Sequence, residues 1–287
     1  MPRNYMDLPY LKFFNLAEEP FSTVPSPRFF FLSPTHAMAL EKTSFVVGAS
    51  KGLTAVFGDT GMGKSSLARL LHEKFSDSGF HSALLTNPNY PTPFSLLRTI
   101  AQEFGIKITH KSYKGMIDIF KDFLYAEAID NDRTVVLIID EAQTLTPQLI
   151  ELLRQLINYE TNDRKLLQLV LFAQEELRDT INRPKLRNFK SRIVFASTLD
   201  PLTYEETKQM IAFRWSVATG GAHDPFTDEA IKIIYEQSQG MPREANILCD
   251  NALLISYYKK EREISAETVA EIADDRHQNL SKRGAAA

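Results

Sequence analysis

Short apolar runs alternate with amphipathic stretches along roughly the first 200 residues of the chain. Five of these runs predict buried strands, at residues 53–57, 82–86, 134–139, 166–172 and 192–196. The run at 134–139 is apolar on both faces, which is typical of a central strand in a parallel sheet. Helical spacing predicts helices at 34–47, 64–75, 94–104 and 115–128, and another that begins at Thr146-Pro147. Strands that alternate with helices predict an α/β fold with a parallel sheet.

The pattern changes after Asp200-Pro201, where only helices are predicted. They cover residues 203–218, 227–239, 242–258 and 265–274. Thr227 is the expected N-cap of the second of these helices, and Gly240 is its stop signal. We therefore predict four parts: an aromatic N-terminal strip packed on the core (1–34), an α/β domain (35–198), a small all-α domain (199–277) and a flexible tail (278–287).

Composition and charge restrict the partners and the compartment. With 33 basic and 36 acidic residues the formal net charge is −3, which excludes a wholly basic nucleic-acid-binding surface but permits a local basic patch. Cys249 is the single cysteine, so the chain forms no internal disulfide and a reducing compartment is expected. No apolar run approaches the roughly 18 residues that span a bilayer, and the N-terminus has no apolar signal region. We expect a cytoplasmic protein without a membrane span.

The most specific motif lies between the first strand and the helix that follows it. Residues 58–65, Gly-Asp-Thr-Gly-Met-Gly-Lys-Ser, match the phosphate-binding pattern G-x-x-x-x-G-K-[ST]. Glycines let backbone N–H groups turn toward phosphate oxygens, and the helix N-terminus adds partial positive charge. Lys64 is expected to reach the β- and γ-phosphates of ATP, and Ser65 to bind Mg²⁺. The predicted nucleotide-binding residues are Gly58, Asp59, Thr60, Gly61, Met62, Gly63, Lys64, Ser65 and Ser66.

A pair of carboxylates ends the central strand. Asp140 and Glu141 follow the run 135–139, 76 residues after Lys64. Ligands of open α/β sheets bind at the carboxyl ends of strands, so Asp140 is placed to hold the Mg²⁺ together with Ser65. Glu141 is placed to polarise an attacking water. The joint pattern predicts a protein that binds ATP and Mg²⁺ and hydrolyses the nucleotide.

The two motifs, followed by an all-helical region, resemble the AAA+ ATPases, in which a P-loop core is followed by a small helical lid. Over residues 11–274 the chain resembles the ExeA/GspA-like group of that family, which is similar to transposition regulators of the TnsC/TniB kind. The resembling stretches are Phe13-Phe14-x-Leu16-x3-Pro20-Phe21, Phe31-Leu32-Ser33-Pro34, Asp140-Glu141-Ala142-Gln143, Asn158-Tyr159-Glu160-Thr161, 167–177, Arg192-Ile193 and Gly240-x-Pro242-Arg243-x2-Asn246-x-Leu248-Cys249.

The resemblance implies further catalytic residues. Gln174 matches the first sensor position, which orients the attacking water or contacts the γ-phosphate. Arg243 matches the second sensor position in the lid. AAA+ sites lie between subunits, so a neighbouring subunit supplies an arginine finger; Arg187 and Arg192 are the candidates, and Arg192 is favoured because it precedes the last strand.

The resemblance also implies binding surfaces, with plain structural alternatives. Phe31 and Leu32 of the aromatic strip are candidates to contact the adenine, or else simply pack. A basic segment between two predicted helices is a candidate DNA surface or else a solvated loop, and it contains Lys107, Lys111, Lys114 and Lys121. A few lysines per subunit would suffice for DNA binding if a ring or filament repeated them.

Two functions follow from the resemblance. The first is an ATP-dependent regulator that assembles with ATP–Mg²⁺ on double-stranded DNA and recruits or activates a transposase, which would select the target of transposition. The alternative is an accessory ATPase of a secretion or pilus assembly system that does not bind DNA. ExeA-type proteins usually carry a membrane helix and a periplasmic part after the ATPase. This sequence departs from them there, so we expect the first function. Both predict slow, regulatory hydrolysis.

Overall fold

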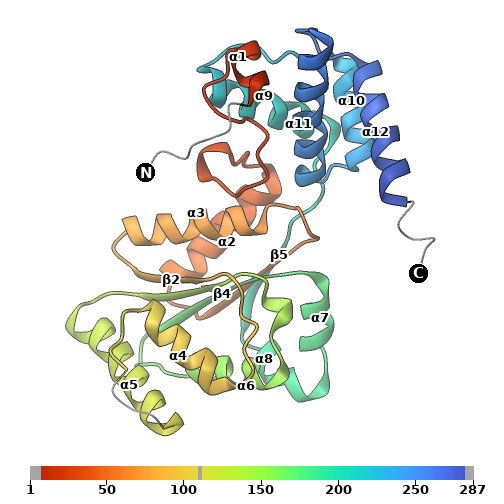
Figure 1. Ribbon diagram of the computed structural model, residues 1–287. Coiled ribbons are helices and arrows are strands. Elements are labelled where there is room, and N and C mark those ends of the chain that lie inside the picture. The colour runs from red at the N-terminus through yellow and green to blue at the C-terminus, as the bar shows by residue number, and fades with distance from the viewer. Residues whose placement is uncertain (1–7, 109–111, 282–287) are drawn as a thin grey trace. The chain divides into compact units, whose positions relative to one another are not determined.

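The computed structural model describes residues 8–108 and 112–281, which form two compact units (Figure 1). The α/β unit comprises residues 34–60 and 64–200. The helical unit comprises the N-terminal residues up to Ser33, the short segment Gly61–Gly63, and the chain from Pro201 onward. The chain therefore passes from the helical unit to the α/β unit at Pro34, returns briefly at Gly61–Gly63, and returns again at Pro201.

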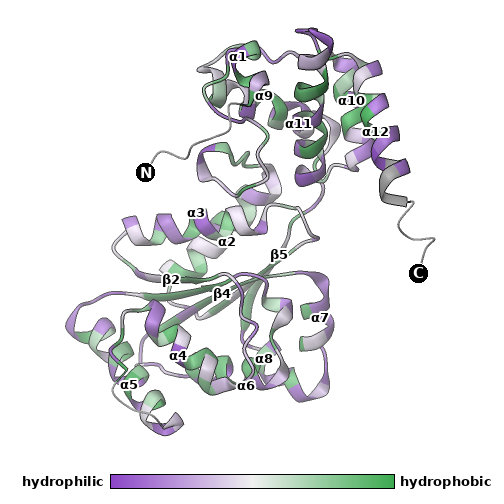
Figure 2. Cartoon of the chain, viewed as in Figure 1, coloured by the Kyte–Doolittle hydropathy of each residue, from purple (hydrophilic) through white to green (hydrophobic). Residues whose placement is uncertain are grey.

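The α/β unit is built on one parallel sheet. Its strands are β1 (Leu53–Phe57), β2 (His81–Leu85), β3 (Val135–Ile139), β4 (Leu167–Ala173) and β5 (Ile193–Thr198), in the order β2-β3-β4-β1-β5. Strands β1, β3 and β4 are buried at every position, and the apolar residues of β4 are green in Figure 2. The predicted α/β fold with a parallel sheet is confirmed.

Helices cover both faces of this sheet. On one face lie α2 (Pro34–Gly48) and α3 (Lys64–Asp77). The other face carries a large apolar core to which α4 (Pro93–Glu103), α5 (Tyr113–Tyr125), α6 (Pro147–Leu156), α7 (Glu175–Ile181) and α8 (Arg187–Lys190) contribute. The sequence did not predict α7 and α8. Three short 3₁₀ turns also occur: η1 (Pro27–Phe29), η3 (Ala142–Thr144) and η4 (Pro184–Leu186).

The helix predicted at 115–128 stops early, because a polar cluster forms at its end. Helix α5 ends at Tyr125 and is followed by a π-helical turn, η2 (Ala126–Asp130). In this turn the buried carboxylate of Glu127 accepts hydrogen bonds from Arg133 Nε at 2.8 Å and from Asn131 Nδ2 at 2.9 Å, and it pairs with His81 Nδ1 at 3.0 Å. Burial by itself would raise the pKa of Glu127, but these partners lower it overall.

The helical unit contains α1 (Pro9–Phe14) from the N-terminal strip and α9 (Tyr204–Thr219), α10 (Asp228–Ser238), α11 (Pro242–Lys259) and α12 (Ala266–Ser281). Its core joins apolar residues of α9–α12 with Tyr10, Phe14, Leu16, Phe21 and Phe29 of the strip. We had expected the strip to pack on the α/β core. It instead belongs to the helical unit, because its buried aromatic side chains fill the core of that unit.

A buried arginine holds the strip in place. The guanidinium of Arg214 on α9 donates to the carbonyl oxygens of Pro20 at 2.6 Å, Ser22 at 2.8 Å and Phe29 at 3.0 Å. Its side chain is only 9% exposed, and burial lowers the pKa of Arg214 to about 10. The next residue, Trp215, packs edge-to-face on the ring of Phe14, with centroids 6.0 Å apart. The strip is therefore fixed by both hydrogen bonds and aromatic packing.

Candidate functional site

The phosphate-binding sequence forms the turn between β1 and α3, where the structure places it at the carboxyl end of β1. Gly61 and Gly63 have φ values of +88° and +86°, which glycine adopts without strain. Within the helical unit, which includes Gly61, the backbone N–H of Arg243 donates to the Gly61 carbonyl oxygen at 3.3 Å. A Cβ at Gly61 would lie 2.9 Å from the Cβ of Arg243, so close packing adds to the need for glycine.

Lys64 begins α3 and is buried inside this turn. Its ammonium donates to the carbonyl oxygens of Gly58 and Asp59, both at 2.8 Å. Burial lowers the pKa of Lys64, and the nearby carboxylates of Glu141 and Asp140 partly offset that effect. The turn therefore holds a desolvated cation at a helix N-terminus, which is the electrostatic requirement for binding a polyphosphate.

Asp140 and Ser65 meet at the carboxyl end of β3. The carboxylate of Asp140, only 4% exposed, accepts a hydrogen bond from the Ser65 side chain and another from the backbone N–H of Glu141 at 3.0 Å. Burial raises the pKa of Asp140, although the hydrogen bonds oppose this. A carboxylate and a hydroxyl side by side are oxygen ligands of the kind that Mg²⁺ takes together with phosphate oxygens and water, so these residues fit the ion.

Glu141 has an unusual backbone. Its φ of +55° and ψ of +36° lie in the left-handed region, which few residues other than glycine adopt. Its carbonyl oxygen accepts from Thr144 Oγ1 at 3.0 Å, and its carboxylate accepts from Gln143 Nε2 at 2.5 Å. Strained backbone of this kind clusters at functional sites, where surrounding contacts hold it in place.

Gln174 lies directly after β4, beside the residues above. Its side-chain Oε1 accepts from Thr60 Oγ1 at 3.1 Å, and its backbone N–H donates to Gln143 Oε1 at 3.2 Å. The structure thus brings together Thr60, Glu141 and Gln174, which the sequence had singled out. Gln143 was part of the resembling stretch 140–143 but received no role, and only the three-dimensional contacts reveal it.

Other predicted residues lie apart from this group. Arg187 is exposed on α8. Arg192 precedes β5 at the amino-terminal ends of the strands and lies near Glu160. Phe31 packs against Phe213 of the helical unit, with ring centroids 6.1 Å apart.

Leu32 is exposed. The contact of Leu32 and Phe31 with an adenine base stays a prediction. Among the candidate DNA-contacting lysines, Lys107, Lys114 and Lys121 are exposed, and Lys111 lies outside the described residues.

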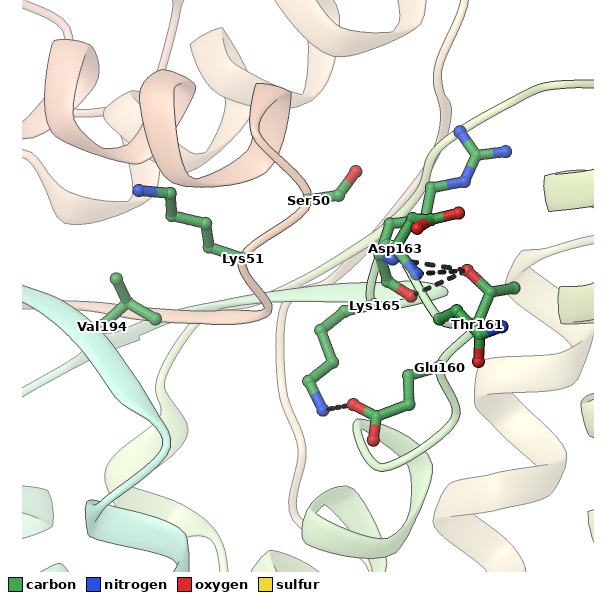
Figure 3. Close-up of a pocket in the computed structure, with 9 residues that line it drawn as sticks. Ser50, Lys51, Glu160, Thr161, Asp163, Lys165 and Val194 are labelled. Carbon is green, nitrogen blue, oxygen red and sulfur yellow. Dashed lines mark hydrogen bonds and ion pairs between the residues drawn. The ribbon is translucent and has the colours of Figure 1, made fainter.

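A cavity of about 770 Å³ lies at the amino-terminal edge of the sheet (Figure 3). Ser50 and Lys51 before β1, residues 160–165 before β4, and Val194 at the start of β5 line it. Glu160 and Lys165 form an ion pair inside it. Since the phosphate-binding turn follows the carboxyl end of β1, this cavity is separate from the candidate nucleotide site.

Comparison with known proteins agrees with this geometry. Residues 48–181 match a family model described as an AAA domain. General secretion pathway protein A of Aeromonas hydrophila is 34% identical over 256 residues, which cover 89% of this chain and 46% of that protein. These matches support an AAA+ ATPase of the ExeA/GspA-like group. This AAA+ protein therefore spans about half the length of the curated relative that it matches.

Several solved structures have a similar fold. The ORC2 protein of Aeropyrum pernix, solved as ADPNP–ADP complexes, has a TM-score of 0.68 at 18% identity. The match covers 90% of this chain and 71% of the ORC2 chain. Cdc6p of Pyrobaculum aerophilum has a TM-score of 0.66 at 16% identity, covering 87% and 68%. The RuvB branch migration motor of Thermotoga maritima has a TM-score of 0.52 at 20% identity, covering 82% and 67%. At these identities the likeness concerns the fold.

The matches do not show the expected resemblance to TnsC/TniB-type transposition regulators, which stays a prediction. Within residues 8–108 and 112–281, no helix of this AAA+ protein is both long and apolar enough to cross a membrane.

Proposed function

We propose that this AAA+ protein binds ATP with Mg²⁺ and hydrolyses it slowly to ADP and phosphate. The observation that carries the proposal is the convergence of Lys64, Ser65, Asp140, Glu141 and Gln174 at the carboxyl ends of β1, β3 and β4. Ligands bind at this edge of an open parallel sheet. The residues supply a cation, metal ligands, a carboxylate base and a polar amide, which together suit the hydrolysis of a phosphoanhydride.

Each residue has a distinct part in the proposed reaction. The backbone N–H groups of residues 58–66 hold the phosphate oxygens, and Lys64 moves from its carbonyl partners to the β- and γ-phosphates. Ser65 and Asp140 hold the Mg²⁺, which would neutralise charge on the phosphates when bound. Glu141 accepts a proton from the attacking water, and the amide of Gln174 orients that water or contacts the γ-phosphate.

We extend the proposal to an assembly with the ATP site at a subunit interface, in a ring or helical filament. A neighbouring subunit would supply Arg192, or alternatively Arg187, to the charge that develops on the transferred phosphate; such an arginine is worth about 10³-fold or more in rate. Arg243 would link the helical unit to the nucleotide state, and Phe31 and Leu32 would contact the adenine.

Two substitutions test the ATPase. Lys64→Ala is expected to abolish binding of a fluorescent ATP analogue, because the loop loses its only cation. Glu141→Gln is expected to keep ATP binding and stop turnover, measured as released phosphate. If Glu141→Gln hydrolyses ATP at the wild-type rate, Glu141 is not the base.

The sequence match favours a secretion or pilus assembly partner for this protein. The relative that is 34% identical is named as a general secretion pathway protein. We therefore propose that ATP-driven changes in assembly act on a component of such a system. Deleting the gene should reduce protein export or pilus formation, and the wild-type gene, but not the Lys64→Ala variant, should restore it. Normal export in the deletion strain would refute this role.

DNA transposition, with double-stranded DNA and a transposase as partners, is the second candidate. Lys107, Lys114 and Lys121 are exposed, which supports it. The acidic residues Asp118 and Asp122 are also exposed, on α5 with Lys114 and Lys121, and they lower the local positive charge. A duplex DNA with a nonhydrolysable ATP analogue should give salt-sensitive binding and filaments visible by electron microscopy. Absence of DNA-stimulated assembly at low salt would refute this role.

A further inference from the structure

We propose that Gln143 is a positioning residue that holds the carboxylate of Glu141 and joins it to the end of β4. This inference rests on the proposed function, because it concerns the base proposed for ATP hydrolysis. Gln143 lies in the turn η3, two residues after Glu141. Its side-chain amide donates from Nε2 to Glu141 Oε2 at 2.5 Å and accepts at Oε1 from the backbone N–H of Gln174 at 3.2 Å.

The partner on β4 fixes which way this amide faces. A backbone N–H can only donate, so the N–H of Gln174 must meet the oxygen of the Gln143 amide. The NH₂ group is then turned toward Glu141, whose carboxylate oxygen accepts. A flipped amide would place N–H against N–H on one side and oxygen against carboxylate oxygen on the other. One orientation satisfies both neighbours, so Gln143 is a directional link between Gln174 and Glu141.

The link continues from Gln174 to the phosphate-binding turn. Gln174 Oε1 accepts from the hydroxyl of Thr60 at 3.1 Å. Three hydrogen bonds therefore connect Thr60, Gln174, Gln143 and Glu141, which belong to the turn after β1, the end of β4 and the turn after β3. Hydrogen bonds in a chain polarise one another. The chain of hydrogen bonds therefore connects the proposed base to the turn after β1.

The contacts of Glu141 divide between backbone and side chain. Its N–H donates to Asp140 Oδ1 and its carbonyl oxygen accepts from Thr144 Oγ1, and these bonds hold the left-handed backbone. Neither bond involves the side chain of Glu141. Within the described residues, Gln143 is the one side chain shown to donate to this carboxylate. The direction in which the proposed base points therefore depends on Gln143.

Two substitutions distinguish the two hydrogen bonds of the Gln143 side chain, the one to Glu141 and the one from Gln174. Gln143→Met keeps the length of the side chain and removes both hydrogen bonds. Gln143→Glu keeps an acceptor for the N–H of Gln174 but removes the donor to Glu141 and sets like charges together. A hydrogen bond to a charged group corresponds to about a 10- to 100-fold effect, so kcat for ATP should fall by that factor in both variants. The Kd for a nonhydrolysable ATP analogue with Mg²⁺ should stay within about twofold, because Gln143 does not contact Lys64 or Ser65.

A structural role predicts a different result, which the controls detect. The matched control is Gln102→Met, an exposed amide on α4, which should leave kcat and the thermal midpoint unchanged. The thermal midpoints of the two Gln143 variants should also equal that of the wild type. A loss of nucleotide affinity and thermal stability that accompanies the loss of kcat would overturn the proposal.

The outcomes distinguish this inference from the function on which it rests. A wild-type protein that releases no phosphate, or a Glu141→Gln variant with full turnover, overturns the proposed ATPase chemistry and this inference with it. If the wild type is active and Glu141→Gln is not, while both Gln143 variants keep kcat within about twofold of the wild type or above it, the role of Gln143 alone is refuted. A selective fall in kcat in both variants confirms it.

Discussion

Replacing Arg214 by methionine should release the N-terminal strip from the helical unit. The guanidinium donates to three carbonyl oxygens of the strip, those of Pro20, Ser22 and Phe29. Methionine has a similar length and fills similar space, but it has no donor. The substitution therefore removes the hydrogen bonds and leaves most of the packing.

The size of the effect follows from two opposing contributions. A buried polar group that loses its partner costs about 1–3 kcal/mol, so three carbonyl oxygens cost about 6 kcal/mol together. Burial lowers the pKa of Arg214 from its ordinary value to about 10, which corresponds to about 3 kcal/mol of unfavourable desolvation that the variant no longer bears. The net loss of unfolding free energy is expected to be about 3 kcal/mol.

The only tryptophan of the chain provides the assay. Trp215 contacts Phe14 of the strip, so its fluorescence reports both release of the strip and unfolding of the helical unit during a urea titration. Tryptic cleavage after Arg28 gives an independent measure of release. Lys232→Met, which removes an exposed cation from α10 of the same unit, is the matched control and should change neither readout.

A clear result would refute this reasoning. If the unfolding free energy of Arg214→Met is within about 0.5 kcal/mol of the wild-type value, as for an ordinary surface substitution, and cleavage after Arg28 is no faster, the three hydrogen bonds do not hold the strip.

Three further predictions concern stability and pH. Gly240→Ala should destabilise the helical unit by at least about 2 kcal/mol, because φ is +72° and a Cβ would lie 2.1 Å from the carbonyl oxygen of Leu202; an unchanged urea midpoint would contradict this. Burial raises the pKa of the Cys249 thiol, so this thiol should not react with a disulfide reagent at about pH 8 until the helical unit unfolds. The free energy of unfolding should fall above about pH 9, where only the unfolded chain loses the thiol proton. Rapid labelling of the native protein would contradict this prediction. The folded-state pKa of Glu127 is lowered, so its stabilising effect is present above about pH 4.5 and is lost on acidification. Glu127→Gln should therefore reduce the fall of the unfolding free energy at acidic pH. An unaltered dependence on pH would show that the cluster with Arg133 does not contribute to stability.

The sheet was predictable because its strands are short apolar runs separated by turn residues, a pattern that local sequence carries. Helices α7 and α8 were missed because they are short and Pro184 interrupts the spacing of their apolar residues. The strip shows a different limit. Its aromatic residues indicate burial, but the sequence does not say which surface covers them, since Arg214 lies 194 residues from Pro20.

The candidate nucleotide-binding residues also divide into those that local sequence reveals and those that it does not. The pattern at 58–65 and the Asp-Glu pair at 140–141 are local, so a single stretch of sequence reveals them. The link from Thr60 through Gln174 and Gln143 to Glu141 joins three segments and depends on the orientation of one amide. The trans arginine and the protein partners stay predictions, because they depend on a second molecule.

The placement of the strip in the helical unit sets an order of events on the ribosome. Pro20 is synthesised 194 residues before Arg214, its hydrogen-bond partner. At about 5–20 residues per second, this is a wait of about 10–40 s. During that time the strip's aromatic side chains lack their final core, while the whole of the α/β unit is synthesised. The strip is thus made before the α/β unit, but it can complete its hydrogen bonds only after Arg214 has been made.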